Sequence, residues 1–423
     1  MIAYEADWVC PVTSPPIRNG AIAVQRGRII QVGPSADIQG TERVRYAGCA
    51  IIPGFVNTHA HLELTIFHGL LENLRFGDWI AKLVHIKYNA LDRKALKASA
   101  RLGAIEMLQA GVTAVGEVME TGTGWEAMRE FGLQGVAYQE VFGPAEDMAA
   151  ESLRGLQAKV NDYRRHQTET QRIGVSPHAP YTVSKRLYEA VRDFARSESL
   201  PMTAHIAESS EETQFVRDGA GHFAEAHRKR QIAVTARRVL PIAYLDSLGL
   251  LGRDMLLVHA IDADEQDLRR IRDTGAFVSH CPRSNAKLSH GIARVAEMRK
   301  LGIPVSLGTD STASNDSIDM FAEMRLAVSQ QGVREDEAFR MATIEGARAL
   351  GLAHSIGSLD AGKRADFVVI ELKGAVEDPI EAIVRSAHRD CVKATFLAGT
   401  PVSPDGTGVR HEVERIKASI SRA

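Results

Sequence analysis

The chain has few cysteines for its length, and they do not form a recognisable pattern. Its four cysteines, Cys10, Cys49, Cys281 and Cys391, are spread over 423 residues without a CxxC pair. This spacing argues against a disulfide framework and against a thiolate zinc site, and it is typical of a protein from a reducing compartment. We therefore expect a cytoplasmic protein.

Long apolar runs and an excess of one charge are also absent. No stretch reaches the roughly 18 uninterrupted apolar residues of a membrane span, and residues 1–7 lack the basic start of a signal peptide. Lys and Arg total 51 against 53 Asp and Glu, a formal net charge of −2, unlike the basic surface of a nucleic-acid binder. We expect an enzyme or binding protein for a small molecule, without a membrane or nucleic-acid partner.

Most of the chain alternates between short apolar runs and longer segments with helical periodicity. One such helical pattern runs from Ala98 to Leu108 and stops at Gly111. Strands alternating with helices indicate parallel βα units, and eight of them predict an α/β fold, a closed (β/α)8 barrel over residues 51–355. The expected strands are Ile51–Thr58, Val112–Val118, Leu133–Phe142, Ile173–Pro177, Pro201–Ile206, Met255–Ala260, Ala276–Ser279 and Ile303–Leu307.

The two ends of the chain have a different rhythm, in which short strands are broken by glycine and proline turns. We predict that residues 1–50 and 356–423 form one small β-rich domain, with a charged helical tail at the end. The long interval between Ile206 and Met255 predicts a helical insertion on the active-site side of the barrel. The clearest strand patterns at the ends are Ala21–Val24, Arg28–Val32, Phe367–Ile370 and Ala394–Leu397.

Polar side chains stand at the ends of the predicted strands, which is where barrel enzymes build their active sites. His59 and His61 end the first run, and strand alternation places them on the same side. His205 ends the fifth run, and Asp310 follows the eighth. Three imidazoles and one carboxylate suit divalent zinc or iron.

Such a metal site would activate water. A bound divalent cation can lower the pKa of water to about 7, and Asp310 can accept a proton from that water. His259, at the end of the sixth run, can orient the hydroxide, and Glu208 can carry a proton to the substrate and leaving group. These residues predict a hydrolysis or a hydrolytic deamination and leave open which C–N bond is broken.

Each of these residues also has a simpler explanation. A lone histidine is more often a structural group than a ligand, Asp310 can cap a helix N-terminus, and Glu208 can open a helix with Ser209 and Ser210. Placement favours the functional explanation, because four polar clusters fall at the ends of four different predicted strands.

Six motifs stand out along the chain: Pro53–His61, His205–Glu208, Val258–Ala260, Ser279–Asn285, Leu307–Ser311 and Gly357–Phe367. They resemble the amidohydrolase superfamily over nearly the whole chain, and they are most similar to its aminohydrolase branch. The resemblance implies that His59, His61, His205 and Asp310 bind the metal. It also implies proton transfer by Glu208 and His259. Ser176–Pro180 stands where binuclear relatives have a bridging lysine, so one divalent metal per chain is implied, with zinc favoured and ferrous iron as the alternative.

The resemblance also suggests substrate-binding residues. His178 would contact ribose and Trp79 would pack against adenine, although a turn histidine and a core tryptophan are equally simple explanations. The relatives that deaminate S-adenosylhomocysteine and methylthioadenosine have a ribose-binding glutamate where this chain has Tyr88. They also have a carboxylate-binding arginine near Glu140. We place all four residues, together with Asn285 of the motif above, in the substrate site.

The stretch Tyr138–Pro144 resembles aminodeoxyfutalosine deaminases of menaquinone synthesis, which act on an adenine nucleoside with a benzoate-containing tail. We therefore expect conversion of 6-amino-6-deoxyfutalosine to futalosine. Guanine or another purine or pterin, S-adenosylhomocysteine, methylthioadenosine and a chlorohydrolase-like reaction are the alternatives. A non-enzymatic binding module of this superfamily would have lost ligand positions, and none is lost here. Members of the superfamily that this chain resembles often pair through their barrels, so a homodimer is a further expectation.

Overall fold

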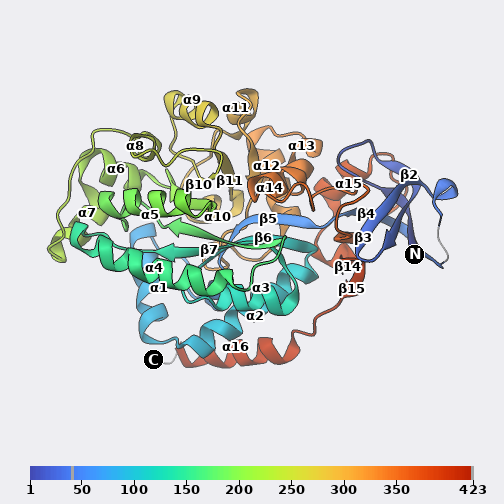
Figure 1. Ribbon diagram of the computed structural model, residues 1–423, viewed down its shortest axis with the longest axis horizontal. Helices are drawn as coiled ribbons and strands as arrows, with labels where there is room; N and C mark the ends of the chain where they lie inside the picture. The colour runs from blue at the N-terminus through green and yellow to red at the C-terminus, as the bar shows by residue number, and fades with distance from the viewer. Residues whose placement is uncertain (40–41, 421–423) are drawn as a thin grey trace.

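The barrel consists of eight parallel strands that follow one another in chain order. The computed structural model describes residues 1–39 and 42–420, and in it every pair of neighbouring strands from β5 to β12 is parallel. Helices surround these strands (Figure 1), which confirms the predicted (β/α)8 fold. The strands are β5 (Phe55–Ala60), β6 (Val112–Met119), β7 (Gln134–Val141), β8 (Gln171–Pro177), β9 (Met202–Ile206), β10 (Met255–His259), β11 (Phe277–His280) and β12 (Val305–Leu307).

The barrel closes where β12 meets β5. The backbone N–H groups of Thr309 and Asp310 both donate to the carbonyl oxygen of His59, at 3.1 and 2.9 Å. The Thr58 hydroxyl donates to the carbonyl oxygen of Leu307 at 2.9 Å. Closure of the barrel therefore brings together the first and last of the expected metal ligands.

The first expected strand, Ile51–Thr58, is divided between two sheets. Its first three residues end β4 (Glu42–Pro53) of a smaller sheet, and β5 begins at Phe55. Gly54 separates them, and a Cβ at this position would lie 2.0 Å from the Thr113 hydroxyl oxygen. The prediction of one continuous strand was wrong because both halves are equally apolar, so hydropathy does not mark the change of sheet.

Helices cover the barrel and extend its mouth. The predicted helix before Gly111 is α2 (Arg93–Gln109), and Asp92 caps its N-terminus by accepting the Ala95 N–H at 2.8 Å. Gly111 has φ +78°, a left-handed conformation that ends helices. Among the described residues, no helix has the length and apolar character to cross a membrane. The other barrel helices are α1 (Phe76–Asn89), α3 (Thr123–Phe131), α4 (Ala149–Arg164), α5 (Lys185–Ser197), α9 (Glu265–Thr274), α10 (Pro282–Lys287), α11 (Val295–Lys300), α12 (Met320–Gln331), α13 (Glu335–Met341) and α14 (Ile344–Ala349).

The expected insertion between β9 and β10 forms short helices. These are α6 (Ser210–Asp218), α7 (Gly221–Lys229) and α8 (Pro241–Ser247). The rings of Phe223 in α7 and Tyr181 in the loop after β8 stack at 4.0 Å with an interplanar angle of 3°. The insertion is thus packed against a loop at the mouth of the barrel.

The smaller sheet joins the two ends of the chain beside the barrel (Figure 1). The N-terminal strands meet the C-terminal strands where β4 pairs with β13. This arrangement confirms a small β-rich unit built from both ends. The strand order is β15, β14, β13, β4, β1, β2, β3. The strands are β1 (Ile2–Val9), β2 (Ile17–Gln25), β3 (Arg28–Pro34), β13 (Phe367–Glu371), β14 (Val392–Leu397) and β15 (Thr400–Val402).

The helical tail expected at the end of the chain returns to the barrel. It forms α16 (Thr407–Ile420), which lies along α2 (Figure 1), and Arg410 pairs with Glu106 at 2.8 Å. The remaining helix, α15 (Pro379–Ser386), packs against α12 and α13. We retain the two-domain division of the chain as a proposal, in which β4 belongs wholly to the smaller sheet.

Candidate active site and metal centre

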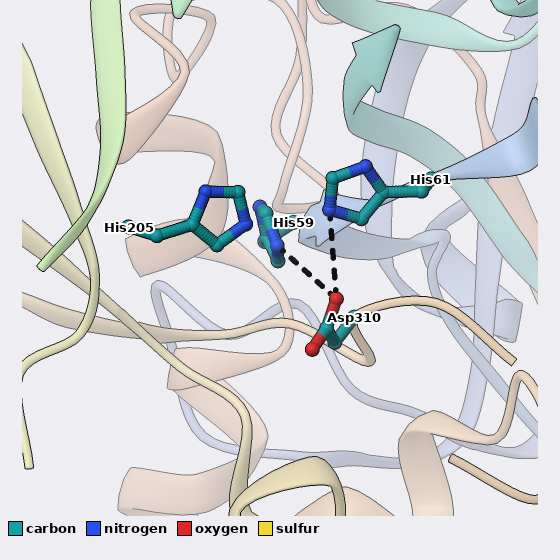
Figure 2. A group of neighbouring side chains, drawn as sticks. All are labelled: His59, His61, His205 and Asp310. Carbon is teal, nitrogen blue, oxygen red and sulfur yellow. Dashed lines mark ion pairs between the residues drawn. The ribbon is translucent and has the colours of Figure 1, made fainter. Parts of the chain in front are cut away.

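Four side chains shielded from solvent converge at the mouth of the barrel. His59 lies in β5 and His61 directly follows it, while His205 lies in β9 and Asp310 follows β12. Their donor atoms lie within 4.8 Å of one another. The Nε2 atoms of His59 and His61 are 3.4 and 3.6 Å from Asp310 Oδ1, and Figure 2 shows these groups gathered around one point. The structure thus brings together all four residues that the sequence predicts as metal ligands.

Hydrogen bonds hold Asp310 through both of its carboxylate oxygens. Oδ2 accepts from the hydroxyls of Ser284 and Ser314 at 2.7 and 2.8 Å, and Oδ1 accepts from the Ser311 N–H at 2.7 Å. The backbone of Asp310 has φ +60°, a region that non-glycine residues seldom occupy and that is enriched at functional sites. The carboxylate is therefore oriented by the fold itself.

The charge state of this cluster fits a divalent cation. Burial lowers the pKa of His61 and His205 well below the ordinary value, and the neighbouring imidazoles reinforce the shift. Burial alone would raise the pKa of Asp310, but its contacts with His59 and the other imidazoles hold that pKa well below its usual range. Neutral imidazoles and an ionised carboxylate are the forms that bind metals. Both ring nitrogens of His59 are buried without a hydrogen-bond partner, and a bound cation would give one of them a partner.

Glu208 stands beside this cluster without belonging to it. Its Oε1 is 3.7 Å from His259 Nε2 and 3.5 Å from His290 Nδ1. Burial raises the pKa of Glu208 well above its usual range, and the charge of Asp310 adds to the shift. Glu212 holds the backbone, because its carboxylate accepts the N–H groups of Glu208 and of the residue before it, both at 2.9 Å. A carboxyl group that keeps its proton in this position is suited to donate it.

His259 is oriented from behind by Asn285. The Nδ1–H of His259 donates to Asn285 Oδ1 at 2.9 Å, so its Nε2 carries the free lone pair. That Nε2 is buried without a hydrogen-bond partner and faces Glu208. Asn285, which the resemblance places among the substrate-binding residues, lies behind His259 rather than on the wall of the neighbouring cavity.

A cavity of about 360 Å³ opens over the metal-ligand cluster. Its floor includes His61, His205 and Asp310, with Glu208 alongside. Much of the rest of its wall is apolar, and α1 provides a large part of it. The four remaining substrate-binding residues predicted from the sequence, Trp79, Tyr88, Glu140 and His178, all line this cavity.

Glu140 and His178 form a polar pair on the cavity wall. His178 Nε2 is 3.9 Å from Glu140 Oε1, and His178 Nδ1 is 2.7 Å from the Thr182 hydroxyl. Burial raises the pKa of Glu140 to about 8 although Lys87 opposes the shift, and burial lowers the pKa of His178 to about 3. Glu140 Oε1 is buried without a hydrogen-bond partner. The pair is suited to bind hydroxyl groups of a ligand, which both donate and accept hydrogen bonds.

The α1 side of the cavity combines an aromatic wall with an ion pair. The Trp79 indole N–H donates to the Ala313 carbonyl oxygen at 3.3 Å, and its side chain is largely buried. Lys87 Nζ pairs with Glu120 at 2.7 Å, and the Tyr88 hydroxyl donates to the same carboxylate at 2.8 Å. Tyr88 is otherwise exposed, so it lies at the outer edge of the cavity.

Residues 50–402 match the model of the Amidohydrolase family. The chain belongs to that family. A relative from Syntrophobacter fumaroxidans, named 5-methylthioadenosine/S-adenosylhomocysteine deaminase, is 30% identical over 425 residues, which cover 95% of this chain and 92% of the relative. The solved structure of an adenosine deaminase from Xanthomonas campestris with bound zinc has a TM-score of 0.87 at 25% identity, covering 100% of this chain and 99% of that one.

Helicobacter pylori aminofutalosine deaminase, solved in complex with methylthio-coformycin, shares the amidohydrolase fold. Its TM-score is 0.85 at 22% identity, and the match covers 95% of this chain and 100% of that one. At that identity the likeness concerns the fold alone. Family membership, deaminase relatives and the buried His/Asp cluster identify this amidohydrolase as a metal-dependent hydrolytic deaminase, the enzyme class expected from the sequence.

Sequence reasoning missed several polar groups in this amidohydrolase. His290 lies beside Glu208 and packs edge-on against the Phe76 ring at 4.4 Å. Lys87 and Arg230 line the cavity, and Lys87 pairs with Glu120 behind it. Only Glu120 directly follows a barrel strand, so the strand-end rule could have found it. The others come from helices and loops, and no local pattern marks them.

Proposed function

We propose that this amidohydrolase removes the amino group from C6 of the adenine ring of a nucleoside, with water as the nucleophile. The observation that carries the proposal is the polar pair Glu140–His178 on the wall of the cavity over the metal cluster. A free base would leave the buried Glu140 oxygen without a partner, whereas a ribose supplies hydroxyl groups beside the base. The name of the Syntrophobacter relative supports a nucleoside substrate.

The residues divide the chemical work between binding and proton transfer. His59, His61, His205 and Asp310 would hold the metal, which when bound supplies activated water at neutral pH. Asp310 accepts a proton from the attacking water, and His259 Nε2 orients that water on one face of the ring. Glu208 donates its proton to ring nitrogen N1, which makes C6 more electrophilic. Collapse of the tetrahedral carbon then breaks the C6–N bond: the amino group leaves as ammonia with the proton that Asp310 accepted, and the C6 hydroxyl returns its proton to Glu208 as the carbonyl forms.

The non-reacting part of the substrate is held away from the metal. Glu140 and His178 bind the ribose hydroxyls, and Trp79 packs against the base. These contacts position C6 without changing during the reaction, so they act through orientation. Losing one of these contacts would raise KM if the contact is equally strong in the ground state and the transition state. It would lower kcat if the contact aligns C6 for attack.

Among adenine nucleosides, we favour 6-amino-6-deoxyfutalosine, which would place this enzyme in menaquinone synthesis. The outer wall of the cavity is apolar, with Phe142, Pro144 and Met148 on one side, and it suits an aromatic tail better than an amino-acid zwitterion. Tyr88 stands where the S-adenosylhomocysteine deaminases carry a glutamate. Methylthioadenosine and S-adenosylhomocysteine are the alternatives that the Syntrophobacter relative supports.

We propose zinc as the metal. Three imidazoles and one carboxylate match the nitrogen and oxygen ligands of catalytic zinc sites, and the Xanthomonas structure contains zinc. Ferrous iron accepts the same donors, so metal analysis of the purified protein decides between the two.

A substrate panel tests the proposal. Ammonia release is measured with adenosine, methylthioadenosine, S-adenosylhomocysteine, guanine and 6-amino-6-deoxyfutalosine. We expect turnover of nucleosides but not of guanine, with the highest kcat/KM for 6-amino-6-deoxyfutalosine. Preference for guanine would refute the nucleoside assignment. Parity between S-adenosylhomocysteine and 6-amino-6-deoxyfutalosine would refute only the finer choice.

A further inference from the structure

Arg230 brings a positive charge to the cavity from the inserted helices. It caps the C-terminus of α7, and its side chain is exposed and lines the cavity wall. The cavity wall contains one other basic aliphatic side chain, Lys87, which is paired with Glu120 at 2.7 Å. Arg230 has no ion pair with any residue in the described ranges 1–39 and 42–420. Its guanidinium is therefore free to bind a ligand.

The helix α7, which ends just before Arg230, packs against the loop that borders the proposed ribose site. Phe223 of α7 stacks on Tyr181 at 4.0 Å, and His227 Nε2 donates to the carbonyl oxygen of Tyr181 at 2.8 Å. The ring of Tyr181 lies 5.8 Å from that of His178. Two contacts thus join the helix that carries Arg230 to the loop that carries His178.

We propose that Arg230 binds a carboxylate carried on the 5′ substituent of the nucleoside, an inference that rests on the proposed function. A planar guanidinium can bind a carboxylate through two parallel hydrogen bonds. A substituent on the ribose 5′ carbon points away from the base, so it extends from the metal toward the cavity mouth. At the mouth the substituent meets an apolar wall and one unpaired cation, Arg230. An apolar tail that ends in a carboxylate needs both of these partners.

Two kinds of tail carry this carboxylate. An amino-acid tail also brings an ammonium group, which requires an anionic or carbonyl partner. The carboxylates that line the cavity are Glu140, Glu208 and Asp310, and all three have other roles in the proposed reaction. A benzoate tail needs only the cation and apolar surface, so we assign it as the better ligand of Arg230.

Steady-state kinetics of Arg230→Ala and Arg230→Lys test this assignment with three substrates. These are 6-amino-6-deoxyfutalosine, S-adenosylhomocysteine and methylthioadenosine, whose 5′ substituent is uncharged. We expect Arg230→Ala to lower kcat/KM for the benzoate substrate by about 10- to 100-fold, mainly through KM, because a charge-assisted contact is lost. The decrease in kcat/KM should be smaller for S-adenosylhomocysteine and almost absent for methylthioadenosine. Arg230→Lys should recover part of the loss.

Lys229→Ala is the matched control, because it removes the same charge from the neighbouring exposed residue, which does not line the cavity. It should leave all three substrates unchanged. If Arg230→Ala lowered kcat/KM equally for the uncharged and the carboxylate substrates, or for none of them, the role of Arg230 would be overturned. The proposed function would stay intact. A wild-type enzyme that deaminates none of the three substrates would overturn both.

Discussion

Replacing Glu208 with glutamine removes a proton donor while preserving the shape of the side chain. Glu208 is buried beside His259 and His290, at 3.7 and 3.5 Å, and lies outside the four-residue metal cluster. Its backbone is held by Glu212 through the main-chain N–H, so the substitution leaves that support in place. Glu208→Gln should therefore fold and bind metal like the wild type.

The expected loss is in turnover. General acid–base catalysis typically contributes about 10²–10⁴-fold, which corresponds to about 2.7–5.5 kcal/mol of transition-state stabilisation. The loss should appear in kcat and kcat/KM together, because the proton is transferred only as the reaction proceeds. Ammonia release and metal content are measured on the same preparations, with Glu225→Gln, at an exposed position of α7 that does not line the cavity, as the control. A Glu208→Gln variant with near-normal turnover, or one that loses its metal, would refute the assigned role.

Two further predictions concern a histidine beside the site and a glycine at the start of the first barrel strand. His290→Phe keeps the ring packing against Phe76 but removes the nitrogen 3.5 Å from Glu208. It should lower kcat by about 10- to 100-fold with little change in KM, because a polar contact to the proton donor is lost, and unchanged kinetics would show that the contact is incidental. Gly54→Ala places a Cβ 2.0 Å from the Thr113 hydroxyl oxygen and should destabilise the fold by about 1–3 kcal/mol. Thermal unfolding checks this against Gly155→Ala in α4, where a Cβ meets nothing within 4 Å and an unchanged or higher Tm is expected.

The barrel and its four ligand positions could be predicted because one geometric rule connects them. The C-terminal ends of parallel barrel strands meet at one face, so a histidine or aspartate at the end of a run is directed to a common site. Because side chains alternate between the two sides of a strand, His59 and His61 are also expected on the same side. These statements depend only on local sequence and strand order, both of which are visible in the chain.

Contacts between loops and inserted helices could not be predicted in this way. Arg230 reaches the cavity because Phe223 stacks on Tyr181, a contact between segments about 40 residues apart that no periodicity marks. The change of sheet at Gly54 depends on the position of Thr113. The substrate-binding role given to Asn285, the cytoplasmic location and the homodimer stay predictions.

We propose that the cluster of His59, His61, His205 and Asp310 holds one divalent metal on which deamination depends. This proposal is tested most directly by titrating chelator-treated enzyme with zinc and measuring ammonia release from methylthioadenosine at each step. We expect no turnover without metal, and a turnover that rises linearly with added zinc and reaches its plateau at one equivalent per chain. Full activity in the metal-free protein, or a plateau that requires two equivalents, would contradict it.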